Sequence, residues 1–144
     1  MGIFNSYNKF YDIVLVFIEG GFMDLKLLFR IAAVIAAING LGMLLMTSTF
    51  IAMANITPTP DLITVGQFTG VTVLFLALLQ WRIPDIAGDA FSSLGQLFAI
   101  GYVMWFLIVG YHIMTGQAGG ATAYVNLVLE AILAVLFFMQ SKKA

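Results

Sequence analysis

A single acidic residue, Glu130, lies inside a long apolar run near the end of the chain, AYVNLVLEAILAVLFFMQSKKA. Asn126 precedes it by four residues, so a helix places both side chains on one face. A carboxyl group and an amide at this spacing can transfer protons, bind a ligand or share a hydrogen bond. The surrounding run predicts that this chemistry lies inside a membrane, where ionisable side chains usually face protein or a wet cavity.

Glu130 has two interpretations. As a functional group it would carry protons or hold a ligand. As a structural group it would be protonated, or hydrogen-bonded to Asn126, Gln67 or Asn39, and would join helices. Transporters usually combine paired charges, broken helices or repeats, whereas this sequence has one deep acid, no accompanying cation and no inverted repeat. The pattern favours the structural role, with Glu130 directed into the bundle or a subunit interface.

His112 is the only histidine of the chain and lies beside Tyr111 and a glycine-containing loop. One imidazole can ligate haem or a chlorophyll-type pigment, but no second ligand or motif accompanies it. An interfacial polar residue is therefore the favoured interpretation. Trp105 lies deeper than the aromatic residues at the predicted helix ends and is a candidate contact for a partner or cofactor. The sequence leaves lipid, quinone and pigment open as cofactor classes.

No residue is assigned to catalysis or to a metal. The chain has no cysteine, which excludes disulfides, thiolate metal sites and cysteine nucleophiles. No metal cluster, catalytic triad, phosphate loop or redox pair occurs in the sequence. Asp85 and Asp89 are expected to be solvated in a loop, or to cap the helix that follows.

The composition is that of an integral membrane protein. Of 144 residues, 62% are hydrophobic and 9% are charged, whereas soluble domains carry about 25% charged residues. So few charges cannot cover a surface that faces water. A net charge of −1 provides no basic face for nucleic acid.

Four runs have the roughly 20 apolar residues needed to cross a membrane as a helix, and they lack the alternation of barrel strands. Their expected bounds are 27–53, 62–81, 91–113 and 123–140. Proline and glycine punctuate the connections, and Asp61 is expected to cap the second helix. Short connections make neighbouring helices antiparallel. We therefore predict an all-α, four-helix membrane bundle.

The basic residues set the expected orientation. All six fall on one side of a four-span chain: Lys9, Lys26, Arg30, Arg82, Lys142 and Lys143. Because positive residues concentrate in cytoplasmic loops, both termini are expected in the cytoplasm, with the chain in a bacterial inner membrane. Residues 1–26 hold an apolar run too short to span, interrupted by Asp12 and Glu19, and are expected to form an interfacial amphipathic helix.

Small residues mark the expected helix contacts. The first span has Ala32, Ala36 and Gly40 at four-residue spacing, and the second has Gly66 and Gly70 in a GxxxG pattern. Helices in lipid associate through close packing at such positions. Packing within one chain is the favoured interpretation, and a homo-oligomer through Gly66 and Gly70 is the alternative.

Three stretches carry a resemblance: NGLGMLL, ITPTPDLITVGQFTGVTVLFLALLQWRIPD and YHIMTGQAGGATAYVNLVLEAILAVLFF. Over about residues 27–140 the chain resembles small four-helix bacterial membrane proteins of the DoxX-like and uncharacterised families. Some DoxX-like relatives are linked to quinone-coupled oxidation or act as accessory subunits. The resemblance implies the fold more than an activity, and the N-terminal extension departs from its pattern.

The leading expectation is a non-catalytic accessory subunit that packs against other integral membrane subunits and lipid, in a photosynthetic, respiratory or oxidase assembly. Little mass lies outside the predicted spans, and the packing surface is large. The alternative is a small transporter, or a quinone- or pigment-binding redox component, that uses Glu130 and His112.

Overall fold

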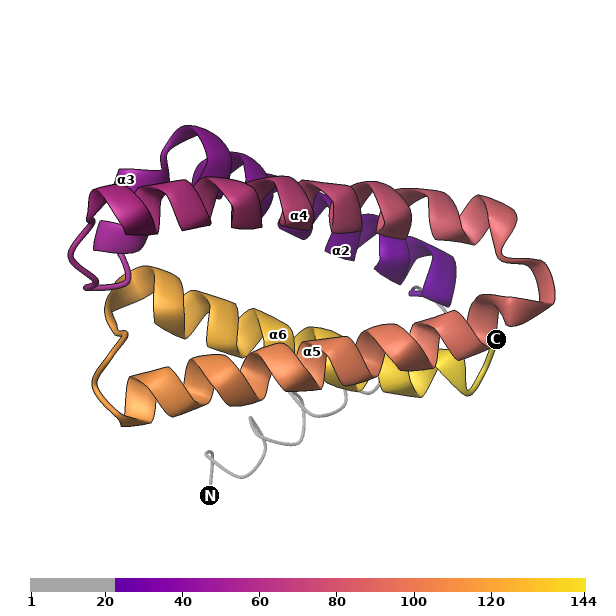
Figure 1. The fold of residues 1–144 in the computed structure, drawn as a ribbon. Coiled ribbons are helices and arrows are strands. Elements are labelled where there is room, and N and C mark those ends of the chain that lie inside the picture. The colour runs from indigo at the N-terminus through magenta and orange to yellow at the C-terminus, as the bar shows by residue number, and fades with distance from the viewer. Residues whose placement is uncertain (1–22) are drawn as a thin grey trace, which may run out of the picture.

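The structure, a computed structural model, describes residues 23–144 and is built from helices joined by short turns (Figure 1). Four helices are long and apolar enough to cross a membrane. These are α2 (Leu25–Leu45), α4 (Pro60–Ile86), α5 (Phe91–Met114) and α6 (Gly120–Ser141), with a short α3 (Thr47–Ala52) and a 3-10 helix η1 (Gly88–Ala90) between them. Residues 23–144 contain no strand. The predicted all-α four-helix membrane bundle is confirmed.

The four long helices form two antiparallel hairpins, α2 with α4 and α5 with α6 (Figure 1). The start of α2, the α4–α5 turn and the C-terminus lie together at one end, here called the terminal end. The α3–α4 and α5–α6 connections lie at the other, here called the loop end. Most of the predicted interfacial segment, residues 1–22, lies outside the described residues, and Asp24 caps α2 through a 2.7 Å bond from the Leu27 N–H.

Glycine lets α4 approach α2 closely. A Cβ added to Gly70 would lie 2.7 Å from the Leu44 nitrogen and 3.0 Å from the Gly40 carbonyl oxygen. Gly66 is also buried, beside Thr47. In lipid this approach brings two backbones into van der Waals contact, which is the main source of helix association. The glycine pair therefore packs inside the chain, and a contact between two copies through it would require α2 to move away.

The first membrane helix is shorter than predicted. It ends at Leu45 and not at residue 53, because Met46 leaves the helical region with φ −128° and ψ 35°. The chain continues into α3, which folds back so that Phe50 lies against Gly42. Any side chain at residue 42 would collide with the Phe50 ring. This glycine thus makes room for the bend.

The start of α4 also differs from the prediction. Thr59, not Asp61, is the capping residue, and its hydroxyl accepts a 3.3 Å hydrogen bond from the Leu62 N–H. Pro60 follows at the first helical position, where its missing N–H removes no hydrogen bond. Asp61 lies in the first turn, where a carboxylate still interacts favourably with the helix dipole.

The end of α4 lies five residues beyond the predicted Trp81, at Ile86. Proline was expected to end this helix, but Pro84 occurs inside its last turn. There the proline deprives only the Gln80 carbonyl of its usual backbone donor. The helix therefore continues through the proline.

Asp85 was expected to be solvated in a loop, but it lies in the last turn of α4 and pairs with Arg30. Its carboxylate accepts two 2.8 Å hydrogen bonds from the Arg30 guanidinium, which also stacks 4.3 Å from the centre of the Trp81 ring. Lys26 and Arg82 lie 3.7 and 4.0 Å from the same carboxylate. Both bonds come from one guanidinium nitrogen, Nη2. Hydrogen bonds between charged groups are stronger than neutral ones, so this pair holds the start of α2 against the end of α4. Asp89 is exposed in η1, and no side chain caps α5.

The α5–α6 hairpin is joined at the terminal end through Ser92, whose hydroxyl donates a hydrogen bond to the Ser141 carbonyl. Gly95 faces the same serine, and a Cβ there would lie 2.9 Å from the Ser141 Cβ. Ala99, one turn further along α5, is buried. Small residues thus bring α5 and α6 together as they do α2 and α4.

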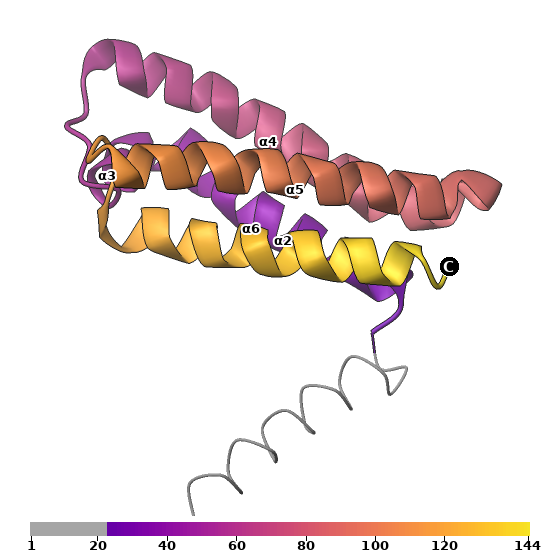
Figure 2. The same ribbon diagram turned by 90° about the horizontal axis from the view of Figure 1, so that it is seen from below.

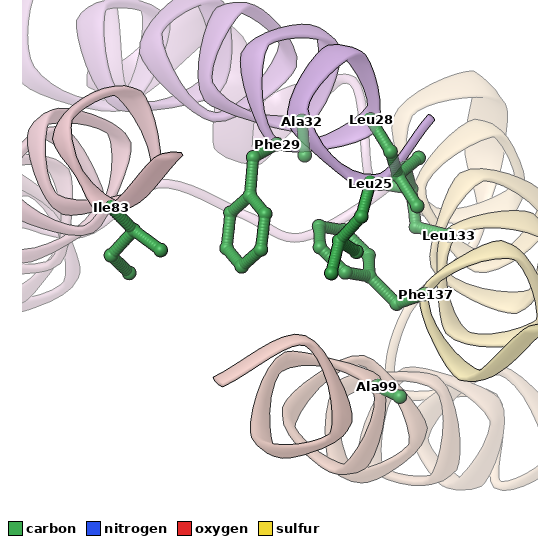
Figure 3. Close-up of a cluster of buried hydrophobic side chains, with 8 residues drawn as sticks. All are labelled: Leu25, Leu28, Phe29, Ala32, Ile83, Ala99, Leu133 and Phe137. Atoms are coloured by element: carbon green, nitrogen blue, oxygen red, sulfur yellow. The ribbon is translucent and has the colours of Figure 1, made fainter. Parts of the chain in front are cut away.

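The two hairpins meet in a hydrophobic core at the terminal end (Figure 3). Phe29 of α2 is fully buried there, with its ring centre 4.8 Å from that of Phe137 and 5.2 Å from that of Phe98. Figure 2 shows α4 and α5 drawing apart toward the loop end. The aromatic core fills the space between the hairpins only at one end. Its buried members are Leu25, Leu28, Phe29, Ala32, Ile83, Ala99, Leu133 and Phe137.

Replacing Gly70 by alanine is expected to lower the free energy of unfolding by about 1–3 kcal/mol, the usual cost of overfilling a packed interface. The added Cβ would press on backbone atoms of Leu44, which cannot rotate away. Gly101→Ala is the matched control, since a Cβ there meets no atom within 4 Å. Reversible unfolding by SDS in mixed micelles, followed by circular dichroism, measures both variants. Equal losses at both positions would contradict the packing argument.

Candidate functional site

A cavity of about 480 Å³ lies between the two hairpins and is here called the interhairpin cavity. All four long helices line it. Small residues in its wall, such as Ala36 of α2, Gly101 of α5 and Ala123 of α6, leave space there. Most of its wall is apolar, and the polar members are Asn39, Thr69, Gln80, Tyr102, His112, Thr122, Asn126 and Glu130. The volume falls within the usual range for small-molecule sites, about 300–1,000 Å³.

Backbone hydrogen bonds join the hairpins at the loop end, in what we call the loop contact. The Gly119 N–H donates to the Ala54 carbonyl at 2.7 Å, and the Thr122 N–H donates to the Met53 carbonyl at 3.4 Å. Two of the N–H groups at the start of α6, which have no partner within a helix, are thereby satisfied. The interhairpin cavity thus lies between the aromatic core and the loop contact.

Glu130 lines the interhairpin cavity at mid-helix. Its Oε2 atom is buried and has no hydrogen-bond partner among residues 23–144. Gln67, an expected partner, lies on an exposed face of α4 and does not line the cavity. The carboxyl group therefore keeps an unused hydrogen-bonding position that points into the protein.

A polar row on α6 continues from Glu130. Asn126 and Thr122 precede it at successive four-residue spacings, and all three line the interhairpin cavity. At 1.5 Å of rise per residue the row is about 12 Å long. Thr122 Oγ1 is the second buried polar atom without a partner among the described residues. Thr122 was not among the site residues predicted from the sequence, although its four-residue spacing from Asn126 places both on one face of a helix.

Gln80 and Tyr102 form a side-chain hydrogen bond between the two hairpins at the wall of the cavity. The Tyr102 hydroxyl donates to Gln80 Oε1 at 3.2 Å. Gln80 is buried, and the Tyr102 ring stacks 5.5 Å from that of Phe137. The pair connects α4 to α5 beside the aromatic core. Neither residue was a predicted site residue, because nothing local in the sequence relates positions 22 residues apart.

His112, Trp105 and Asn39 also line the interhairpin cavity. His112 Nδ1 lies 2.6 Å from the side-chain oxygen of Gln117, so this nitrogen is held by the α5–α6 connection. Trp105 is 47% exposed, and its ring therefore borders both the cavity and the outer surface of α5. Residues 23–144 contain no group of three or more His, Cys, Asp or Glu side chains placed to hold a metal ion.

The arrangement suits binding and offers little for covalent chemistry. The wall provides apolar contact area, with a few hydrogen-bonding groups concentrated on α6, which is the pattern of a site for a small organic molecule. No family model, curated protein or solved structure matches the chain. The resemblance to DoxX-like proteins stays a prediction.

The loop contact is tested by comparing Gly120→Ala with Gly116→Ala. Both glycines have φ +71°, so alanine suffers the same backbone strain at either position. Only at residue 120 would the new Cβ also collide with the Met53 carbonyl oxygen, whereas residue 116 has no atom within 4 Å. We expect Gly120→Ala to lengthen the distance between spin labels at Thr57 and Thr115, measured by pulsed electron paramagnetic resonance, and Gly116→Ala to leave it unchanged. Similar distances in the two variants would show that the collision does not separate the loops.

Proposed function

We propose that the protein binds a small, lipid-soluble molecule in the interhairpin cavity, within the membrane. The observation that carries this proposal is the buried Glu130 Oε2 atom without a partner in the described residues, inside a cavity of about 480 Å³. A polar atom buried without a hydrogen bond costs about 1–3 kcal/mol. A ligand that supplies the missing hydrogen bond recovers this cost. Quinones and other lipids among the expected cofactor classes have both the solubility and the polar group that this site requires.

Ligand binding explains Glu130 better than a purely structural role. A residue that joins helices satisfies its polar atoms on the neighbouring helix, as Tyr102 and Gln80 do. Glu130 makes no such bond to Asn126, Asn39 or Gln67 within residues 23–144. The polar side chains around it line a space instead of closing it.

The binding proposal is tested with Trp105 as a fluorescent probe, in a Trp81→Phe background that leaves one tryptophan. A short-chain benzoquinone in mild detergent is expected to quench it saturably, because Trp105 lines the interhairpin cavity. Gly101→Leu should abolish saturation by filling the cavity. Glu130→Leu should weaken binding roughly two- to tenfold, the value of one net hydrogen bond.

Met104→Leu is the control for these variants, since Met104 is exposed on α5 and does not line the cavity. Linear, unsaturable quenching that is the same in all variants would overturn the proposal.

The accessory-subunit role is the second candidate, and α5 supports it. In its most apolar stretch 6% of the residues are buried inside the chain, against 28% for α2. A helix with so little internal contact offers a broad apolar surface to another integral membrane subunit or to lipid. Stoichiometric co-purification of a larger complex in mild detergent would support this role, and a solitary chain would count against it.

We infer that both termini are cytoplasmic, in a bacterial inner membrane. Five basic residues in the described part lie at the terminal end: Lys26, Arg30, Arg82, Lys142 and Lys143. Because the chain has no cysteine, Thr57→Cys and Asp89→Cys each introduce one exposed thiol, at opposite ends. A membrane-impermeant maleimide added to intact cells should label residue 57 and should reach residue 89 only after permeabilisation. The reverse pattern would invert the topology.

A further inference from the structure

The surface between α2 and α6 is hollowed next to the interhairpin cavity. A second hollow of about 300 Å³ lies there and shares Asn39, Thr122 and Asn126 with the cavity. Ile38 and Val125 also line this hollow and are 63% and 56% exposed. Since α2 and α6 are long and apolar enough to span the membrane, apolar side chains exposed along them face lipid.

Both ends of the bundle are closed to a ligand that would enter the interhairpin cavity. At the terminal end the aromatic rings of Phe29 and Phe137 pack 4.8 Å apart between the hairpins. At the loop end the hydrogen bonds of Gly119 and Thr122 to the opposite hairpin must break before the loops separate. Entry through the hollow between α2 and α6 would require neither change.

The charges of the wall restrict the head group of such a ligand. No lysine or arginine of residues 23–144 lines the interhairpin cavity, and Glu130 is its only acidic residue. A carboxylate or phosphate would therefore lie beside Glu130 without a counter-ion. A cationic head group would have to leave the membrane surface for mid-membrane depth, which is unfavourable. A neutral hydroxyl meets neither obstacle and can donate a hydrogen bond to the Glu130 carboxyl.

We propose that the ligand is a single-tailed amphiphile with a neutral, hydrogen-bonding head group that enters laterally between α2 and α6. The head group binds along the row of Thr122, Asn126 and Glu130, and the tail passes between Ile38 and Val125 into the bilayer. This inference rests on the proposed function and adds to it the chemical class of the ligand and its route.

Head-group preference is tested in lipid nanodiscs with three probes that share one sixteen-carbon chain carrying a nitroxide. They are an alcohol, a carboxylic acid and a primary amine. Quenching of Trp105 fluorescence in the Trp81→Phe background measures how much probe occupies the interhairpin cavity. The Gly101→Leu variant, in which leucine fills the cavity, measures the quenching that comes from probe in the surrounding lipid. The alcohol is expected to bind about tenfold more tightly than the acid or the amine, because each charged head group leaves an unbalanced or displaced charge.

The route is tested with a matched pair on α6, Val125→Phe and Val128→Phe. The two valines are 56% and 57% exposed, but only Val125 lines the hollow. Val125→Phe is expected to slow association of the alcohol by about fivefold or more, while Val128→Phe leaves it unchanged. Equal rates would overturn the lateral route. Equal affinities for the three probes would overturn the head-group class. If no probe quenches saturably, the proposed function itself fails.

Discussion

Close backbone approach at glycine is the contact on which this bundle depends. Lipid supplies no hydrophobic drive between helices, so the attraction must come from van der Waals contact and hydrogen bonds. Gly40 and Gly70 provide that contact in the first hairpin, and in the second hairpin Gly95 leaves room for the Ser141 side chain. The close contact of α2 with α4 thus occupies Gly40 and Gly70. What remains between the hairpins is a mixture of large and small side chains that cannot fill the space evenly.

The uneven filling explains where the interhairpin cavity lies. Phe29 and Phe137 fill the space at the terminal end, where Arg30 and Asp85 also tie α2 to α4. Further along the helices the wall includes Ala36 and Gly101, which are too small to fill the space. The loop contact then joins the hairpins again. A space that is bounded at both ends can persist without collapse, because closing it would require the aromatic core or the loop contact to move.

The two boundaries differ in strength and in what they allow. The aromatic core buries several rings with edge and stacked contacts, which add to ordinary burial. The loop contact consists of two backbone hydrogen bonds, one of them 3.4 Å long. Low-stability regions are those with few buried apolar contacts. Any separation of the hairpins should therefore begin at the loop end and pivot about the aromatic core.

The sequence predicted what depends on neighbouring residues. Continuous apolar runs indicated four membrane helices, and the spacing of Gly66 and Gly70 indicated a close-packing face. Prediction from the sequence placed the end of α4 wrongly, because Pro84 suggested a helix end and yet lies within this helix. It also failed where partners are distant in the chain, because Arg30 and Asp85 are 55 residues apart. The cavity is a property of four helices together, so no single stretch of sequence could reveal it.

Glu130 shows how far a local pattern can be taken. Its four-residue spacing from Asn126 correctly places both on the face of α6 that lines the cavity. The same spacing suggested a hydrogen bond that would stabilise the bundle, yet the Oε2 atom has no partner in residues 23–144. An ionised carboxyl at a membrane-helix centre costs about 2.5–3.5 kcal/mol on insertion scales. A leucine at this position would avoid that cost and would fill part of the cavity. A buried carboxyl oxygen without a partner on a neighbouring helix supports the proposal that Glu130 binds a small molecule.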